Sequence, residues 1–555
     1  MVQKRDELRW NGWGRLDRFF DMGGRENEVW RVFAEAFGVP SLPHTPPPSL
    51  EETEIPPSRA TQALIGALGE VISTDRIRTT PYERAFHAYG RSYHDLLRLR
   101  SGKIEHAPDV VVYPCNLDEV LGVLKVAERF SCAVIPFGGG TSVVGGVEAK
   151  KGDSHEAIIT LDTTLLSRFI GVDPTSLTAT AEAGIDGPDL ENALSSCGYF
   201  LGHYPQSFEH STLGGWIASR SAGQLSNRYG TIADMVVSVQ LATPSGVLET
   251  KPFPASAAGP DLNALISGSE GTLGVITKAT LRVHRLPECR RIDAFLFRDF
   301  WEGVDALRSL VQEEVGASLI RLSDPEETKW FGALDRVINP KPLQNFAEDL
   351  LNHLGYREKS LMLVGFEGKQ EEVERASRRA RAILRSSRGL FVGEGPGRSW
   401  WKKRFHMPYL RDPMLDHGLG IDTLETASEW SHLPRLYEEV CRALRDSLST
   451  STFTPLVLTH ISHSYHDGAS LYFTWIFLRD SRDPIGQWKK AKHAASFAIV
   501  KNHGTISHHH GVGIDHAPFL VDEKGKVGMQ LLEHIKRSLD PHSIMNPGKL
   551  MAGNR

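Results

Sequence analysis

Short apolar runs and helical periodicities alternate through the first half of the chain. Residues 110–113 and 133–135 are apolar runs of strand length, and they flank a segment, 116–130, in which apolar residues recur every three to four positions. Asn116 is a good N-cap for that segment. The pattern predicts a strand–helix–strand unit. Further strands are predicted at 157–161, 168–172, 177–183, 236–243 and 275–283, with a helix between Pro188 and Gly198 and a turn at 244–246.

A second series of alternating elements begins at Arg291. Strands are predicted at 292–297, 318–322 and 360–366, and helices at 301–315 and 370–385. Two more strands, 455–463 and 469–477, flank a turn at 466–468 that places Tyr465 at the tip of a hairpin, and a helix follows from Pro484 to Asn502. We therefore predict an α+β protein whose second domain is an antiparallel sheet with helices on one face.

Four regions follow from these patterns. Residues 1–105 are predicted to be mostly helical, with a proline-rich connector at 41–57. Residues 106–287 form one α+β domain, 288–500 form the antiparallel-sheet domain, and 501–555 form a C-terminal segment. A chain of 555 residues is too long for a single core, which agrees with this division.

Composition argues against several classes of protein: nucleic-acid-binding, disulfide-rich secreted and membrane-spanning proteins. Lys and Arg number 63 against 68 Asp and Glu, and no basic stripe predicts nucleic-acid binding. The five cysteines have no metal or disulfide spacing, which fits a reducing compartment. We see no secretory or peroxisomal signal and no apolar run of about 18 residues. We predict a cytoplasmic protein and leave open peripheral membrane contact and a homodimer.

Three glycine-rich stretches carry the first chemical signal. Residues 136–142 read Pro-Phe-Gly-Gly-Gly-Thr-Ser after a predicted strand, and glycines without Cβ let backbone N–H groups converge on a diphosphate. Val143 breaks the dinucleotide fingerprint, and no P-loop sequence occurs. A tight structural turn is the alternative for this loop alone. Similar Gly, Ser and Thr combinations at 206–222 and 268–276 favour a phosphorylated cofactor instead.

The order of these stretches resembles a known family. PFGGGTS, QSFEHSTLGGWIASRSAG, GSEGTLGVIT and LDPHSIMNPGK are similar to motifs of the FAD-binding oxidoreductases of the vanillyl-alcohol oxidase and p-cresol methylhydroxylase type. The resemblance implies a two-subdomain FAD-binding domain, a cap domain, a C-terminal segment that returns to the flavin, and non-covalent FAD. The implied cofactor-binding residues are Pro136, Phe137, Gly138, Gly139, Gly140, Thr141, Ser142, Gln206, Ser207, Phe208, Glu209, His210, Ser211, Thr212, Ser219, Arg220, Ser221, Ala222, Glu270, Gly271, Thr272, Leu273, Gly274, Val275 and Ile276.

Other segments resemble one branch of that family, the alkyldihydroxyacetonephosphate synthases. These segments are LRWNGWG at 8–14, IRLSD at 320–324, YLRD at 409–412, SYHDGA at 464–469 and the histidines at 508–510. Such transferases exchange the acyl chain of acyl-dihydroxyacetone phosphate for a long-chain alcohol in ether lipid biosynthesis, without net redox change. The resemblance implies that Tyr465 is the acid/base at C1 and that Arg411 and Arg321 bind the phosphorylated, lipid-like substrate.

The triplet His508, His509 and His510 is followed by Gly511-Val512-Gly513. Adjacent imidazoles on a glycine-flanked turn suit proton handling, although a solvated turn is the alternative. A tyrosine base with a pKa of about 10 needs a positive field, and we expect the triplet to supply it. Adjacent residues of an extended segment point to opposite faces, so we expect at most two imidazoles at the flavin and no metal site.

Several of these residues also have a purely structural explanation. Each arginine alone is more often a salt-bridged or surface side chain, and a solvated face explains Lys402, Lys403 and Arg404 better than a membrane-binding cluster does. On the same fold, an FAD-dependent oxidase or dehydrogenase of a 2-hydroxy acid or related alcohol, with a histidine base, is the main alternative. A non-catalytic flavin-binding scaffold is the third.

Overall fold

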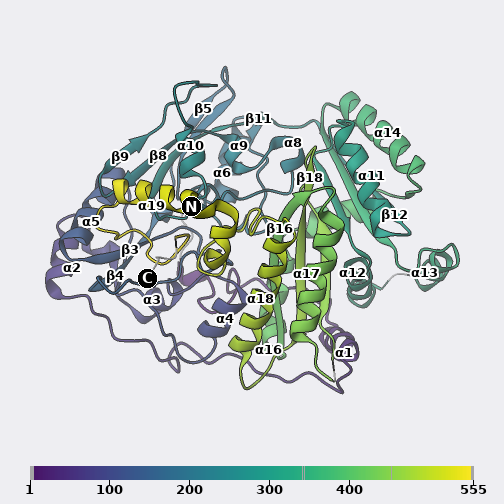
Figure 1. The fold of residues 1–555 in the computed structure, drawn as a ribbon, viewed down its shortest axis with the longest axis horizontal. Helices are drawn as coiled ribbons and strands as arrows, with labels where there is room; N and C mark the ends of the chain where they lie inside the picture. The colour runs from purple at the N-terminus through teal and green to yellow at the C-terminus, as the bar shows by residue number, and fades with distance from the viewer. Residues whose placement is uncertain (1–4, 341, 343, 452, 552–555) are drawn as a thin grey trace.

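The computed structural model describes residues 5–340, 342, 344–451 and 453–551. The first four residues of the predicted region 1–105 and the last four of 501–555 lie outside this part. Figure 1 shows two sheet-containing bodies side by side, the first formed by strands of the N-terminal half and the second by later strands. Helix α19 (Leu520–Leu539) crosses over the first body, so the C-terminal segment returns to it. The predicted α+β class is confirmed.

The predicted strand–helix–strand unit forms the first sheet, whose order is β1-β2-β4-β3. Strands β2 (Val110–Val112) and β3 (Cys132–Phe137) are both parallel to β4 (Ala157–Asp162), which lies between them. Helix α5 (Leu117–Arg129) begins at Asn116, whose side chain accepts the N–H of Glu119. Strand β1 (Ile77–Arg78) is the antiparallel edge. This arrangement directs the end of β3, and the glycine loop after it, toward the second body.

A five-stranded antiparallel sheet completes the first body, in the order β5-β6-β10-β8-β9. The turn at 244–246 exists, but it joins β8 to an extra edge strand, β9, and β10 pairs with β8 on the other side. Helix α6 (Gly187–Ser196) is capped by Asp186 and carries Pro188 in its first turn, as predicted. The strands span Phe169–Asp173 (β5), Thr178–Glu182 (β6), Val275–Arg282 (β10), Val236–Thr243 (β8) and Gly246–Glu249 (β9).

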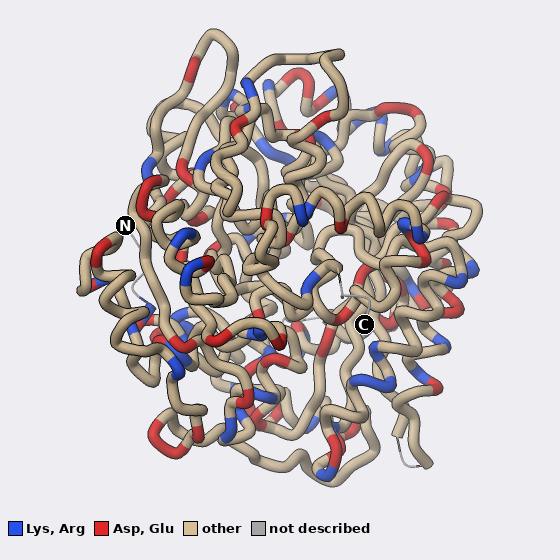
Figure 2. The backbone as a smooth tube through the Cα atoms, turned by 60° about the vertical axis from the view of Figure 1, so that its left-hand side comes forward, with Lys and Arg blue, Asp and Glu red and all other residues tan. Residues whose placement is uncertain are grey.

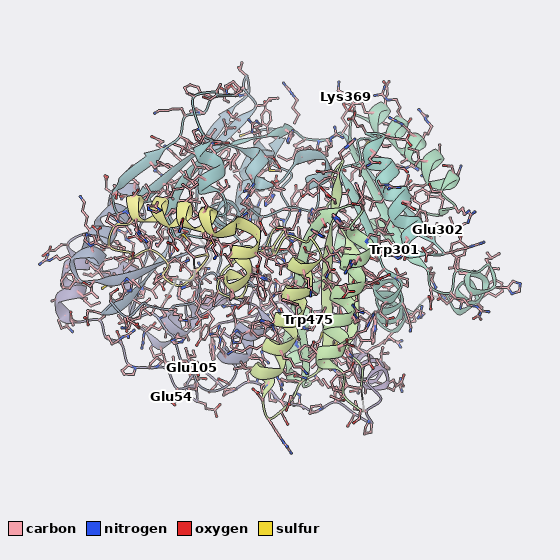
Figure 3. The ribbon with its side chains drawn as sticks, in the orientation of Figure 1. Glu54, Glu105, Trp301, Glu302, Lys369 and Trp475 are labelled. Carbon is pink, nitrogen blue, oxygen red and sulfur yellow. The ribbon has the colours of Figure 1, made fainter. Side chains whose placement is uncertain are left out.

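The second body, which we call the cap, contains a seven-stranded antiparallel sheet in the order β15-β12-β14-β13-β17-β18-β16. Trp475 of β18 is buried in the core between this sheet and its covering helices (Figure 3). The strands span Leu390–Gly393 (β15), Cys289–Phe297 (β12), Ser360–Gly368 (β14), Leu319–Ser323 (β13), Leu456–Ile461 (β17), Gly468–Leu478 (β18) and Leu419–Glu429 (β16).

Helices on one face were predicted for this sheet, and both faces are covered. Four helices pack on one face and share its large core, namely α11 (Phe300–Gln312), α14 (Gln370–Ser386), α17 (Leu433–Leu448) and α18 (Pro484–Lys501). Helix α1 (Glu26–Ala36), in the region predicted to be mostly helical, and helix α12 (Pro325–Ile338), which the sequence patterns did not predict, build a second core with Leu458 and Ile476 of the sheet. The N-terminal region therefore braces the cap.

The remaining N-terminal helices are short, and the surface carries mixed charge. Helices α2 (Gln62–Gly69), α3 (Pro81–Phe86) and α4 (Tyr93–Leu99) occupy the stretch predicted to be mostly helical. Lys and Arg alternate with Asp and Glu over the whole backbone (Figure 2), and no basic stripe is visible in that view. Within the described residues, none of the helices is long and apolar enough to span a membrane.

Candidate active site

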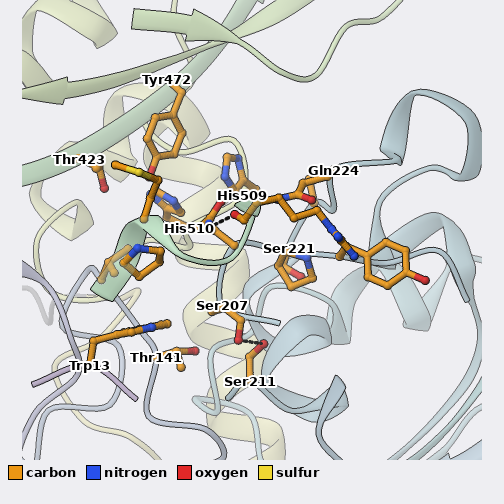
Figure 4. Close-up of a pocket in the computed structure, with 18 of the residues that line it drawn as sticks. Trp13, Thr141, Ser207, Ser211, Ser221, Gln224, Thr423, Tyr472, His509 and His510 are labelled. Carbon is orange, nitrogen blue, oxygen red and sulfur yellow. Dashed lines mark hydrogen bonds between the residues drawn. The ribbon is translucent and has the colours of Figure 1, made fainter. Parts of the chain in front are cut away.

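A cavity of about 840 Å³ lies between the first body and the cap. The first body contributes the loop after β3, helix α7 (Leu213–Ser219) and residues 270–271 and 274–276. Cap strands contribute every second side chain: Leu319, Arg321 and Ser323 of β13 line the cavity, whereas Ile320 and Leu322 enter the helix-covered core. Figure 4 shows hydroxyls of Thr141, Ser207 and Ser211 on one side and Tyr472, His509 and His510 on the other.

The glycine loop presents free backbone donors to this cavity. The N–H groups of residues 139–143 donate no hydrogen bond to any described residue, although all five residues line the cavity. A Cβ on Gly139 would lie 1.9 Å from the carbonyl oxygen of His210, and Gly140 has φ +69°. Only glycine fits there. Unpaired donors at a cavity wall need a partner there, so the loop fits the diphosphate of FAD, which residues 139–143 would hold.

Most of the predicted cofactor-binding residues line the cavity. Those that do so are Pro136, Phe137, Gly138, Gly139, Gly140, Thr141, Ser142, Gln206, Ser207, Ser211, Thr212, Ser219, Ser221, Ala222, Glu270, Gly271, Gly274, Val275 and Ile276. The buried Oε1 of Gln224, another lining residue, has no hydrogen-bond partner among the described residues. That atom is a further polar group available to a bound cofactor.

The other six predicted residues do not line the cavity, because each is used in local packing. Phe208 stacks on Trp216 and Phe405 in the core, and Leu273 belongs to the same core. Glu209 pairs with Arg18, and His210 is hydrogen-bonded to the hydroxyl of Tyr409. Arg220 ends α7 in the left-handed conformation, and the Thr272 hydroxyl donates to the carbonyl of Ser269.

Four histidines, which we call the imidazole cluster, gather at the cap side: His463, His508, His509 and His510. His508 Nε2 lies 2.5 Å from the Tyr465 hydroxyl, and His508 Nδ1 lies 2.9 Å from His509 Nδ1. His463, His509 and His510 line the cavity. Tyr465 and His508 do not, and Tyr465 remains 37% exposed at its turn. The contacts form a hydrogen-bonded chain from solvent, through Tyr465 and His508, to His509 at the cavity.

Two carboxylates, the buried Glu425 and the half-buried Glu270, fix the ends of the histidine segment. Glu425 of β16 accepts the backbone N–H groups of His508, His509 and His510, at 2.5, 3.0 and 2.8 Å, and the hydroxyl of Ser507. Glu270 accepts those of Val512 and Gly513, at 2.6 and 2.7 Å. Glu270 therefore connects the cofactor side to the histidine segment. Burial raises the pKa of Glu270 to about 7, whereas the pKa of Glu425 lies well below its usual range, so the hydrogen bonds to the charged Glu425 are the stronger ones and hold the histidines in place.

The prediction that the histidine triplet supplies a positive field at Tyr465 is wrong. Burial lowers the pKa of His508 and His510 below the ordinary value and that of His463 and His509 well below it, so these imidazoles are neutral at pH 7. Burial also raises the pKa of Tyr465 above 10. Glu425 is the charged group: its contacts with the histidine segment, among them the hydrogen bond from the His509 N–H, outweigh burial and hold its pKa well below the usual range. Tyr465 and His508 are thus a neutral, hydrogen-bonded pair.

The two predicted arginines both reach the cavity but differ in their partners. Arg321 Nη2 lies 3.0 Å from Glu327 Oε1, so its charge is neutralised within the cap. Arg411 is half-buried, forms no ion pair within 4.0 Å among the described residues, and has a buried Nε without a hydrogen-bond partner. Its guanidinium lies 5.6 Å from the ring centre of Trp13. Arg411 is therefore the better candidate for an anionic ligand.

Part of the cavity lining is apolar, and we call it the apolar arm: Phe331, Leu334 and Ile338 of α12, Leu361 and Leu363 of β14, and Phe20, Trp400 and Met407. Such a lining favours a hydrocarbon chain over a polar ligand. Lys402, Lys403 and Arg404 also line the cavity, so they are not simply a solvated face.

The sequence patterns missed His463, Glu425 and Trp13. His463 is the last residue of the predicted strand 455–463 and lies three positions after His460, so the two-residue period of a strand would put the two on opposite faces. Both line the cavity because the observed strand β17 ends at Ile461, which the strand period did not predict. Glu425 lies 83 residues before His508 and has no local signal. Trp13 was noted only as part of a motif, and its backbone N–H donates to Asp412 beside Arg411.

Replacing Glu425 with Gln should disorder the histidine segment. The new side-chain amide would turn its NH₂ group toward backbone N–H donors that now share a carboxylate, and unpairing a buried charged group costs about 3–5 kcal/mol. A shift of about 1 Å at catalytic groups costs about 100-fold in rate. We expect kcat to fall by about 100-fold with FAD content retained, as measured by steady-state kinetics and flavin absorbance.

The matched control is Glu523→Gln. Glu523 accepts the Ile506 N–H and the Thr505 hydroxyl just before the same segment, but its side chain is 30% exposed and lies outside the cavity. It should retain most activity. Full activity in Glu425→Gln, with FAD bound, would show that the carboxylate does not position the histidines.

Comparisons with known proteins agree with this geometry. Residues 108–251 match the family model described as FAD binding domain, and residues 286–550 match FAD linked oxidases, C-terminal domain. Alkyldihydroxyacetonephosphate synthases of Trypanosoma brucei brucei and Dictyostelium discoideum are each 31% identical to the chain over 98% of its length, covering 92% and 93% of those relatives. A solved alkyldihydroxyacetonephosphate synthase structure superposes with a TM-score of 0.86 at 29% identity, with 99% of each chain covered.

The predicted cofactor and fold are confirmed by these matches. FAD is the cofactor of this protein, and the free amides of residues 139–143 lie within the segment that matches the FAD binding domain. The cap and its histidine segment lie within the second matched region. With relatives of this similarity along nearly its whole length, the chain belongs to the alkyldihydroxyacetonephosphate synthase family of FAD-binding proteins.

Proposed function

We propose that the protein exchanges the acyl chain of acyl-dihydroxyacetone phosphate for a long-chain alcohol. The observation that carries this proposal is the content of one cavity: free amides for FAD, a half-buried arginine without an ion-pair partner among the described residues, neutral imidazoles and an apolar arm. A phosphorylated ketone with a hydrocarbon chain matches the last three features together. A small 2-hydroxy acid leaves the apolar arm without a role.

The reaction balances without an external oxidant. A proton leaves C1, the bond between C1 and the acyl oxygen breaks, and a carboxylate departs. The alcohol oxygen then bonds to C1, its proton is released, and C1 regains a proton. When bound, FAD supplies an electrophilic ring that stabilises negative charge at C1. The protein must bind the phosphate, place the chains and move protons.

Proton movement follows the hydrogen-bonded chain of the imidazole cluster. In the tautomer in which His509 offers a lone pair to the cavity, His509 accepts the C1 proton and passes its Nδ1 proton to His508. His508 passes its Nε2 proton to the Tyr465 oxygen, and the Tyr465 hydroxyl proton leaves to solvent. Each group gains one proton and loses one. Tyr465 acts at the solvent end of the chain, one residue away from the cavity-lining His509.

Substrate binding follows from the charge and the lining of the cavity. Arg411 binds the phosphate, because a planar guanidinium can donate two parallel hydrogen bonds to phosphate oxygens. The apolar arm along α12 receives the acyl chain and then the alcohol. Arg321, already paired with Glu327, orders the cap side of the cavity.

Exchange of a radiolabelled long-chain alcohol into acyl-dihydroxyacetone phosphate tests the activity. The proposal predicts labelled ether product and one carboxylate released for each product formed. A dehydrogenase of 2-hydroxy acids would instead bleach the flavin when lactate or a related acid is added without an electron acceptor. Bleaching together with absent ether product would overturn the proposal in favour of that alternative.

We also propose peripheral contact with a membrane in the cytoplasm. The cysteines of the described residues are all unpaired, which fits a reducing compartment. Helix α13 (Gln344–His353) protrudes beside α12 (Figure 1), and Phe346, Leu350 and Leu354 repeat every fourth position at 66, 49 and 48% exposure. Because α12 lines the apolar arm, a bilayer at this face would deliver lipid substrates to it.

The double variant Phe346→Ser, Leu350→Ser should lose vesicle binding. Burial of each side chain contributes about 1.5–3 kcal/mol, so binding should weaken at least tenfold. Sedimentation with anionic phospholipid vesicles measures this. Val247→Ser, with 45% exposure on β9 of the first body, is the control and should bind like the wild type. If the double variant bound vesicles as strongly as the wild type, α13 would not be part of the membrane contact.

A further inference from the structure

Three members of the imidazole cluster also form a group with the geometry of a metal site. One ring nitrogen each from His463, His508 and His509 lie within 4.8 Å of one another. We propose that this triad binds one zinc ion, and that the ion inhibits the enzyme. The binding site stands on the structure alone, and the inhibition rests on the proposed function. Two residues of the triplet take part, and the third ligand comes from the cap hairpin.

Small adjustments would complete the coordination. Zinc–nitrogen bonds are about 2.0–2.1 Å, so tetrahedral nitrogen ligands lie roughly 3.4 Å apart. His508 Nδ1 and His509 Nδ1 are already 2.9 Å apart. The terminal torsion of histidine is soft, so ring rotation can bring the three nitrogens to a common centre. The fourth position is left to solvent.

The surroundings supply what a dication needs. A carboxylate oxygen of buried Glu425 lies 3.6 Å from His509 Nδ1, so negative charge is present beside the triad. The Ser226 hydroxyl lies 2.6 Å from His463 Nδ1, which fixes that ring and leaves its Nε2 for a ligand. The imidazoles are neutral, and neutral nitrogen lone pairs are the ones that bind metals.

The donor set also selects the kind of ion. Three imidazoles suit zinc, copper, nickel and cobalt, whereas magnesium and calcium prefer oxygen ligands. An ion can arrive through the cavity, because His463 and His509 line it. His510 lines the same cavity but is not a member of the triad. It therefore provides a matched comparison within one loop.

Bound zinc would occupy the lone pairs through which protons pass. His508 and His509 are the middle and cavity-side members of the chain that begins at Tyr465. With a metal on these rings, His509 cannot accept a proton from C1. We expect reversible inhibition that a chelator such as EDTA relieves, with FAD still bound.

Titration calorimetry of the tag-free, FAD-loaded protein with zinc chloride tests the site. We expect one zinc per chain and no heat of binding with magnesium. His463→Asn and His509→Asn should each weaken zinc binding by more than about 100-fold, because even outer-shell partners of a metal contribute about 10- to 100-fold. His510→Asn should bind zinc like the wild type. FAD content and melting temperature verify the folding of each variant.

X-ray absorption at the zinc edge gives a second readout on the wild type alone. Three nitrogen ligands from imidazole are expected, so the site stays testable even if a variant fails to fold. The site would be overturned if the wild type bound less than one zinc per chain, or if His463→Asn bound zinc as tightly as the wild type. Zinc binding without loss of activity would overturn the inhibition alone. A protein without synthase activity that still binds zinc at the triad would refute the proposed function and leave the site intact.

Discussion

Arg411→Ala should lower kcat/KM for the phosphorylated ketone by roughly 30- to 5000-fold, with FAD content unchanged. This range corresponds to about 2–5 kcal/mol, the loss expected when a buried charge pair loses one member. Arg411 is half-buried with a buried, unpartnered Nε, forms no ion pair of its own among the described residues, and lines the cavity beside Trp13. Its removal therefore leaves a bound phosphate without its cation. Steady-state kinetics over ketone concentration measure the effect.

Arg321→Gln is the matched comparison for Arg411→Ala. Arg321 lines the same cavity, but Glu327 already neutralises its charge, so the substitution should alter ketone binding much less. Inorganic phosphate should compete with the ketone in the wild type and in Arg321→Gln, and should lose this effect in Arg411→Ala. Loss of the flavin's yellow colour in Arg411→Ala would show that the arginine holds FAD instead.

Tyr465→Phe should reduce turnover by about 100- to 10,000-fold, the usual contribution of a general acid or base. The substitution removes only the hydroxyl that joins His508 to solvent, so protons accepted by His509 have no route out. Exchange of the C1 proton of the ketone with deuterated solvent, followed by mass spectrometry, measures the same step directly. Both rates should fall together.

Chemical rescue separates a proton path from a structural role. Because Tyr465 is 37% exposed, its removal should admit small bases, and added imidazole should restore part of the activity. Tyr409→Phe is the control, since its hydroxyl binds His210 away from the cavity, and imidazole should not change its rate. Wild-type exchange in Tyr465→Phe would exclude the proton path described above.

Local patterns predicted the elements whose signals are local. Asn116 caps α5 and Pro188 lies in the first turn of α6, as their positions predict. Helix α12 was missed although Asp324 caps it and Pro325 begins it, a usable start signal. Helix α19 was missed for a different reason. It begins after Phe519 without a side-chain cap and is interrupted at the non-helical Gly525, so its start has no local signal.

The active site shows the same division between local and distant signals. The glycine loop at 139–143 is recognisable because its chemistry resides in consecutive residues. Glu270 was correctly placed at the cavity, but its main contact, with the N–H groups of Val512 and Gly513, spans 242 residues. Arg321 and Arg411 differ only through the presence of Glu327 near one of them. Such partners are chosen by tertiary packing, which no local pattern contains.

The central claim is that this cavity forms an ether bond with no net transfer of electrons. Anaerobic turnover followed by flavin absorbance, with acyl-dihydroxyacetone phosphate, long-chain alcohol and product measured in the same sample, tests it most directly. The account predicts ether product and free carboxylate in equal amounts, with all flavin oxidised at the end. Flavin that stays reduced, with oxidised substrate in place of the ether, would contradict it.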